Sequence, residues 1–194
     1  MSPPYAEVIG DPVAHSKSPA IHRFWLDRLG IAGNYRATSL RPAALPAYLA
    51  ERRADPAWRG CNVTMPLKEA VLPFLSGLDA EAEATGAANM VGADLKGFNT
   101  DVAGVRDCLE DRVVRLSGII RIVGTGGAAR AAVRGVLLAG ADRNDVVVHG
   151  RSVEKAGALA RALLGEPKQG RTLDPGELSG ATLLINASPL GMKG

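Results

Sequence analysis

The feature that most constrains the fold of this 194-residue chain is an apolar run that leads directly into a group of glycines. The run is Ile119–Val123, and the sequence GTGGAAR follows it at positions 124–130. Glycines permit a tight turn, and the Ala-, Val- and Leu-rich segment behind them predicts a helix. A strand, a glycine-rich turn and a helix in this order predict a dinucleotide site, because backbone N–H groups at the helix N-terminus can bind a pyrophosphate. A purely structural glycine turn is the alternative.

Apolar runs separated by helical patterns recur along the whole chain. The strands that we expect are Tyr5–Ile9, Asn34–Thr38, Gly60–Val63, Ala87–Val91, Ile119–Val123, Val146–His149 and Leu183–Ile185. Strand–helix alternation of this kind is typical of α/β proteins. Residues 99–116 predict a helix that connects the first four strands to the last three. We therefore expect an α/β protein of two domains, residues 1–100 and 101–194.

The first helix has the clearest end signals. Ser18 can cap it, Pro19 suits its first position because proline lacks an N–H group, and Gly30 can end it. Apolar residues recur every four positions within it, which predicts a buried stripe. The residues expected in this stripe are Ile21, Trp25 and Leu29.

Composition excludes several classes of function. Hydrophobic residues make up 46% of the chain and charged residues 22%, so the chain can bury a core. The net charge of +3 comes mostly from scattered arginines, and only 4% of residues are aromatic, so a nucleic-acid surface has little support. No apolar run is long enough to span a membrane. Cys61 and Cys108 lack the spacing of metal ligands, so we expect no metal site, free thiols and a cytoplasmic location.

The residues after the second strand of the glycine-rich half indicate which dinucleotide binds. Val146–Val148 is followed by His149, Gly150, Arg151 and Ser152. NAD sites usually place an Asp or Glu at this point to bind the ribose 2′-hydroxyl, whereas a guanidinium and a hydroxyl suit a 2′-phosphate. The pattern therefore favours NADP over NAD. A solvated surface role for Arg151 is the alternative.

Two charged residues in other motifs are candidates for proton transfer beside a nicotinamide. Lys68 lies in the sequence NVTMPLKE, shortly after an expected strand, and Asp101 lies in GFNTD at the junction of the two halves. A lysine and an aspartate could manage the proton that accompanies hydride transfer to a carbonyl. Equally, Lys68 could pair with a surface acid, and Asp101 could cap the connecting helix.

Six short motifs occur along the chain: IGDPVAHSKSP, NVTMPLKE, GAANMV, GFNTD, GTGGAAR and INASPLGM. Their order and spacing resemble those of the shikimate dehydrogenase family. The resemblance implies an N-terminal α/β substrate domain and a Rossmann-like, doubly wound NADP-binding domain. The family continues beyond the position of Gly194, so we expect the second domain to be incomplete at its C-terminus, with an open sheet edge after Leu183–Asn186.

The resemblance also implies roles for individual residues. Lys68 and Asp101 correspond to the catalytic pair, whereas His15 is expected to shape the serine turn rather than to act as an acid. The implied substrate-binding residues are Ser16, Ser18, Thr64, Lys68, Asn89, Thr100 and Asp101. The implied cofactor-binding residues are Gly124, Thr125, Gly126, Gly127, Ala128, Arg151, Ser152, Asn186, Ser188 and Met192.

The activity that the resemblance implies is the reversible, NADPH-dependent reduction of 3-dehydroshikimate to shikimate in aromatic amino-acid biosynthesis. In the reducing direction a protonated Lys68 would donate to the ketone oxygen, and Asp101 would favour its ammonium form, although the residues leave open which of the two is the formal donor. A quinate/shikimate dehydrogenase that uses NAD and a non-catalytic, ligand-binding fragment are the alternatives. The expected partner is the small-molecule substrate, bound by a monomer or homodimer.

Overall fold

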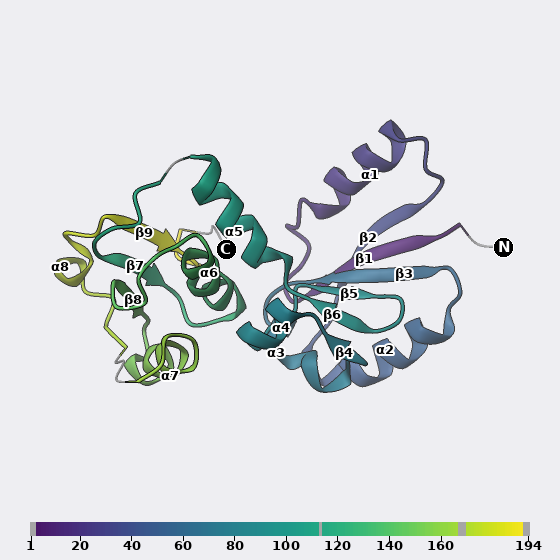
Figure 1. Ribbon diagram of the computed structural model, residues 1–194. Helices are drawn as coiled ribbons and strands as arrows, with labels where there is room; N and C mark the ends of the chain where they lie inside the picture. The colour runs from purple at the N-terminus through teal and green to yellow at the C-terminus, as the bar shows by residue number, and fades with distance from the viewer. Residues whose placement is uncertain (1–2, 113, 167–169, 192–194) are drawn as a thin grey trace. The chain divides into compact units, whose positions relative to one another are not determined.

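The computed structural model describes residues 3–112, 114–166 and 170–191 and consists of two compact units (Figure 1). Unit 1 is Met1–Asn99 and unit 2 is Thr100–Gly194. Each unit alternates strands and helices, which confirms the α/β prediction.

In the described part of unit 1, six strands form one sheet in the order β2-β1-β3-β5-β6-β4. The strands are β1 Tyr5–Gly10, β2 Asn34–Ser39, β3 Trp58–Val63, β4 Gly77–Leu78, β5 Met90–Gly92 and β6 Lys96–Phe98. β1 pairs in parallel with β2 and β3, whereas β5 is antiparallel to both β3 and β6. The carboxyl ends of β1 and β3 therefore lie side by side at one edge.

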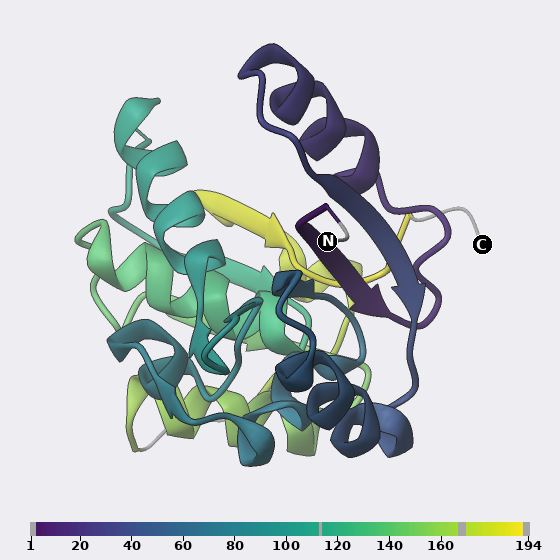
Figure 2. The same cartoon turned by 90° about the vertical axis from the view of Figure 1, so that its right-hand side faces the viewer.

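Helices cover both faces of this sheet (Figure 1). They are α1 Ser18–Arg28, α2 Leu45–Ala54, α3 Leu67–Ala70 and α4 Ala80–Thr85, with short 3-10 turns η1 Pro42–Ala44 and η2 Leu72–Phe74. The larger core packs α2, α3 and α4 against one face, around Leu45, Trp58 and Leu67. A smaller cluster of Val8, Val13 and Tyr35 lies on the other face, where α1 runs along β1 and β2 (Figure 2).

The structure corrects two expectations about α1. Ser18 is its first helical residue rather than its cap, and the side chain of the capping residue Lys17 makes no capping hydrogen bond. The expected buried stripe is wrong, because Ile21, Trp25 and Leu29 are 52%, 53% and 65% exposed. The helix instead faces the sheet through Pro19 and Leu26. Several stripes of α1 are apolar, so periodicity alone could not select the one that packs.

A carboxylate lies inside the larger core of unit 1. Glu7 on β1 is fully buried and accepts hydrogen bonds from the side chains of Arg36, Thr38, Tyr48 and Arg52. Burial alone would raise the pKa of the Glu7 carboxyl, but these donors outweigh it and hold the pKa below its ordinary value. The ionised form is therefore the one that the fold accommodates.

Unit 2 contains a parallel sheet with the order β8-β7-β9 among its described residues. The strands are β7 Ile120–Val123, β8 Val146–His149 and β9 Leu183–Asn186, and the helices are α5 Thr100–Asp111, α6 Gly127–Leu138, α7 Val153–Leu164 and α8 Pro175–Leu178. Small residues of α6, including Ala129 and Ala132, are buried against the strands. Their small side chains let α6 approach the sheet closely, which places its N-terminus at the carboxyl ends of β7 and β8.

Candidate active site

The carboxyl ends of β1 and β3 are joined by backbone hydrogen bonds just beyond the strands. The N–H of Thr64 donates to the carbonyl of Ile9, and the N–H of Asp11 donates to that of Met65, at 2.9 and 3.0 Å. A Cβ atom at Gly10 would lie 2.8 Å from the Met65 carbonyl oxygen, so only glycine permits this approach. The backbones of the first motif and of NVTMPLKE are thus joined side by side at this end of the sheet.

The two serines of the first motif lie in a hydrogen-bonded turn that leads into α1. The N–H of Ser16 donates to the Val13 carbonyl at 3.0 Å, and Ser16 Oγ accepts from the N–H of Ser18 at 3.2 Å. Both serines are partly exposed, and His15 between the strand and the helix is exposed. Two hydroxyls in this turn can form hydrogen bonds with an anionic or polyhydroxylated ligand.

Lys68 and Asn89 adjoin Thr64 at the end of β3. The Lys68 backbone carbonyl accepts from the N–H of Ala88 at 2.8 Å, and the Asn89 carbonyl accepts from the N–H of Val63 at 2.7 Å. Backbone contacts therefore bring together the three segments that carry an ammonium, a hydroxyl and an amide. These are Lys68 on α3, Thr64 before it and the buried Asn89 before β5.

Asn99 holds the chain where the next predicted residues begin. Its side-chain amide donates to Thr85 Oγ1 at 2.9 Å and to the Ala87 carbonyl at 3.0 Å, and its own N–H donates to Asp79 at 3.3 Å. These hydrogen bonds hold Asn99, the residue that directly precedes Thr100 and Asp101, in place. The GFNTD motif alone does not reveal the role of Asn99, because its amide partners lie 12 and 14 residues earlier in the chain.

Thr100 and Asp101 are the first residues of α5. A carboxylate in the first turn of a helix is stabilised by the partial positive charge of the unpaired N–H groups. The position of Asp101 thus agrees with a helix-end role, and the catalytic role stays a prediction.

The glycine-rich turn of unit 2 is built as the sequence predicts. Gly124 has a φ of +134°, and a Cβ atom there would lie 2.6 Å from the Ala187 carbonyl oxygen, so packing requires glycine. Gly126, the N-cap of α6, has a φ of −97°, and a Cβ there would meet no atom within 4 Å. Neither strain nor packing explains that glycine. The open space at the helix N-terminus fits the approach of a pyrophosphate.

Arg151 and Ser152 follow β8 beside this turn. The N–H of Gly124 donates to the His149 carbonyl at 2.8 Å, and a Cβ at Gly150 would lie 2.7 Å from the Thr125 methyl group. Arg151 is exposed, and Ser152 caps α7 by accepting from the N–H of Lys155 at 3.2 Å. The Ser152 hydroxyl can still donate, so this edge offers a cation and a donor to a phosphate.

The predicted residues at the end of β9 form a compact turn. Asn186 Oδ1 accepts from both the N–H and the hydroxyl of Ser188, at 3.1 and 2.7 Å, and its amide donates to the Leu190 carbonyl at 3.0 Å. Met192, the last predicted cofactor residue, lies outside the described residues.

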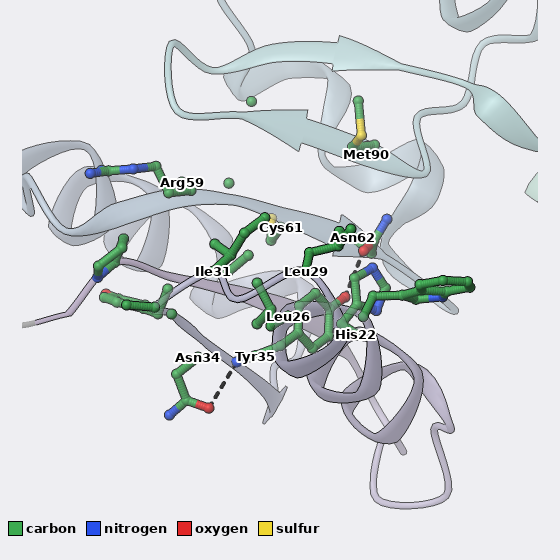
Figure 3. A pocket seen from close by; sticks show the side chains of 18 of the residues that line it. His22, Leu26, Leu29, Ile31, Asn34, Tyr35, Arg59, Cys61, Asn62 and Met90 are labelled. Atoms are coloured by element: carbon green, nitrogen blue, oxygen red, sulfur yellow. Dashed lines mark hydrogen bonds between the residues drawn. The ribbon is translucent and has the colours of Figure 1, made fainter.

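A cavity of about 480 Å³ lies between α1 and the sheet of unit 1, and none of the predicted site residues is among those that line it (Figure 3). Its walls are mostly apolar and include Trp25, Leu26 and Tyr35. Among the residues that the structure describes, no cluster of His, Cys, Asp and Glu side chains could hold a metal ion. No helix in the described ranges is long and apolar enough to cross a membrane.

The chain is similar to known proteins over nearly its whole length. Residues 8–91 match the family model described as the shikimate dehydrogenase substrate binding domain. An NADP(+) shikimate dehydrogenase of Sphingopyxis alaskensis is 47% identical over 196 residues, which cover 98% of this chain and 69% of that protein.

Solved structures agree with this match. A shikimate 5-dehydrogenase of Thermus thermophilus, crystallised with NADP(H) and shikimate, has a TM-score of 0.82 and 39% identity, with 96% of this chain and 69% of that one covered. The Mycobacterium tuberculosis shikimate dehydrogenase has a TM-score of 0.78 and 31% identity, with 96% and 71% covered. The protein therefore belongs to the shikimate dehydrogenase family.

Proposed function

We propose that this protein catalyses the reversible, NADPH-dependent reduction of 3-dehydroshikimate to shikimate. The observation that carries the proposal is that backbone hydrogen bonds bring the segments of Thr64, Lys68 and Asn89 together at the carboxyl end of β3. They also join this end to the end of β1, which leads into the Ser16–Ser18 turn, in a chain related to structures that hold shikimate. Shikimate is a small polyhydroxylated ring with a carboxylate, so its binding calls for hydroxyl, amide and cationic partners rather than apolar surface.

The substrate-binding roles follow from the groups that each motif supplies. Ser16 and Ser18 are assigned to the substrate carboxylate and hydroxyls, and Thr64 and Asn89 to further ring hydroxyls. Thr100 completes the set from the start of α5. Unit 1 is the substrate domain of this proposal, and unit 2 is the cofactor domain.

Lys68 and Asp101 are assigned to proton transfer. Bound NADPH supplies hydride to the ring ketone carbon. Protonated Lys68 donates a proton to the ketone oxygen, so a C–H and an O–H bond replace the carbonyl π bond. Asp101 is assigned as the second member of this catalytic pair. In the oxidising direction the neutral lysine accepts the same proton.

The cofactor roles rest on the carboxyl ends of β7 and β8. The turn of Gly124, Thr125, Gly126, Gly127 and Ala128 receives the pyrophosphate, supported by the open N-terminus of α6. Arg151 and Ser152 are assigned to the 2′-phosphate, which selects NADP over NAD. Asn186 and Ser188 are assigned to the nicotinamide end.

The cellular setting is also a proposal. Cys61 and Cys108 are both free thiols, which agrees with a reducing compartment such as the cytoplasm. We expect a monomer or homodimer that binds a small molecule. We expect no nucleic-acid binding, since the chain carries a net charge of only +3.

The test is a spectrophotometric assay of nicotinamide reduction with shikimate or quinate and with NADP or NAD. We expect turnover with shikimate and NADP, and a loss of several orders of magnitude in Lys68→Ala. Lys96→Ala is the matched control, because Lys96 lies on β6 over the Phe98 ring and has no assigned role. Preference for quinate and NAD would favour the quinate/shikimate activity. Binding of shikimate without turnover would favour a non-catalytic ligand-binding protein.

A further inference from the structure

His22 connects α1 to the sheet of unit 1 through two separate contacts. Its Nδ1 lies 2.8 Å from the carbonyl oxygen of Ser18, the first residue of the helix. Its ring stacks on the ring of Tyr35 from β2, with centroids 3.9 Å apart and an interplanar angle of 8°. Figure 3 shows His22 and Tyr35 together at the wall of the cavity. A carbonyl oxygen only accepts, so Nδ1 carries the proton and donates.

Tyr35 extends this connection to the strand that precedes Thr64. Its hydroxyl donates to Asn62 Oδ1 at 2.6 Å, as the dashed line in Figure 3 shows. Burial raises the pKa of Tyr35, so the hydroxyl keeps its proton and remains a donor. Tyr35 also packs against Val13, which lies in the serine turn.

These contacts connect the two halves of the proposed substrate surface. On one side, Ser16 Oγ and the Ser18 carbonyl are part of a single hydrogen-bonded turn that ends at His22. On the other side, Asn62 lies on β3, two residues before Thr64, which directly follows the strand. α1 also packs on the sheet through Pro19 and Leu26, but much of its apolar surface is exposed. Loss of the His22–Tyr35–Asn62 connection would therefore let the serine turn move relative to Thr64.

We propose that His22 is a positioning residue that, through Tyr35 and Asn62, holds Ser16 and Ser18 in register with the substrate-binding end of β3. The proposal rests on the proposed function of that surface. The ring of His22 is not assigned to contact substrate. Its effect is on the placement of the serine hydroxyls, so it should appear in shikimate binding rather than in the hydride-transfer step or in cofactor binding.

Two substitutions remove one link each while preserving the aromatic stack. His22→Phe lacks the N–H that donates to Ser18, and Tyr35→Phe lacks the hydroxyl that donates to Asn62. We expect either change to raise the KM for shikimate about fivefold, the size of effect expected from one lost hydrogen bond. The kcat and the KM for NADP should stay within about twofold of wild type, because neither link reaches unit 2 or the reacting atoms.

Arg23→Leu is the matched control. Arg23 makes the same kind of side-chain contact in the same turn of α1, from Nε to the Pro19 carbonyl at 3.2 Å, but its side chain is exposed. We expect its KM for shikimate to match wild type. Melting temperature is measured for every variant, so that a change in folding is separated from a change in KM.

The outcomes distinguish this inference from the function on which it rests. If wild type does not turn over shikimate, the proposed function fails and the positioning role fails with it. If wild type is active but folded His22→Phe has an unchanged shikimate KM, the positioning role is overturned and the function stands. If His22→Phe does not fold, Tyr35→Phe decides the question by the same criterion.

Discussion

Replacing Glu7 with glutamine should destabilise unit 1 strongly. The side chain is fully buried, and its carboxylate is the common acceptor for Arg36, Thr38, Tyr48 and Arg52. Glutamine has nearly the same shape but no charge, and its NH₂ group faces donors in place of an acceptor. The change therefore removes the ion pairs without opening a large cavity.

The exposure of the two arginines sets the magnitude. Removing one partner of a buried ion pair costs about 3–5 kcal/mol, because the other charge stays buried. The Arg52 side chain is 13% exposed and must bear that cost, whereas the Arg36 side chain is 46% exposed and can turn into water. We therefore expect the free energy of unfolding to fall by about 3 kcal/mol, the lower end of this range. For a chain of this size that corresponds to a fall in Tm of roughly 6–12 °C.

Tryptophan fluorescence is a suitable assay, because Trp25 and Trp58, the chain's two tryptophans, both lie in unit 1. Glu51→Gln is the control. Glu51 also accepts from Arg52, at 2.6 Å, but its side chain is 75% exposed. An exposed pair contributes about 0–1 kcal/mol, so the Tm of this control should fall by less than about 4 °C.

The pH dependence gives a second check on Glu7. Its pKa is lower in the folded protein than the ordinary value of 4.5, so the carboxylate stabilises the fold above that pH. This contribution is lost as the pH falls through the folded pKa. The difference in stability between wild type and Glu7→Gln should therefore narrow in acid. The reasoning would be refuted if wild type and Glu7→Gln melted at the same temperature at neutral pH, or if the difference in stability between them widened in acid.

Three further predictions concern the cofactor site and the thiols. Arg151→Ala should raise the KM for NADP about 10- to 100-fold by removing charge-assisted hydrogen bonds, while the KM for NAD stays nearly constant; an equal loss with both cofactors would contradict the assignment. Gly150→Ala should raise the KM for NADP severalfold, because its Cβ would lie 2.7 Å from the Thr125 methyl, and Thr125→Ser should relieve the effect in the double variant. Iodoacetamide at pH 8 should label exposed Cys108 in the native protein but should label Cys61 only after denaturant is added, because burial raises the pKa of the Cys61 thiol to about 12. Equal labelling of the two thiols in the native protein would contradict this prediction.

The glycine-rich turn shows how far local sequence can predict a site. An apolar strand, a turn that needs glycine at Gly124 and an alanine-rich helix are all properties of neighbouring residues, and the structure confirms that turn. The first helix likewise forms close to its expected limits, with Gly30 at a φ of +64° just after it. Its packing was predicted wrongly, because burial depends on which elements lie across from a helix.

The sequence by itself determined the α/β class, the order of the motifs and the family, since each depends on residue types at fixed spacings along the chain. Only the tertiary structure decided that the segments of Thr64, Lys68 and Asn89 meet at one strand end, that Glu7 is buried among arginines, and that the Asn99 amide binds Thr85. These contacts join segments far apart in sequence. Which segments meet depends on the order of the strands in the sheet, where β5 lies antiparallel beside β3. A pattern of apolar residues does not encode this strand order.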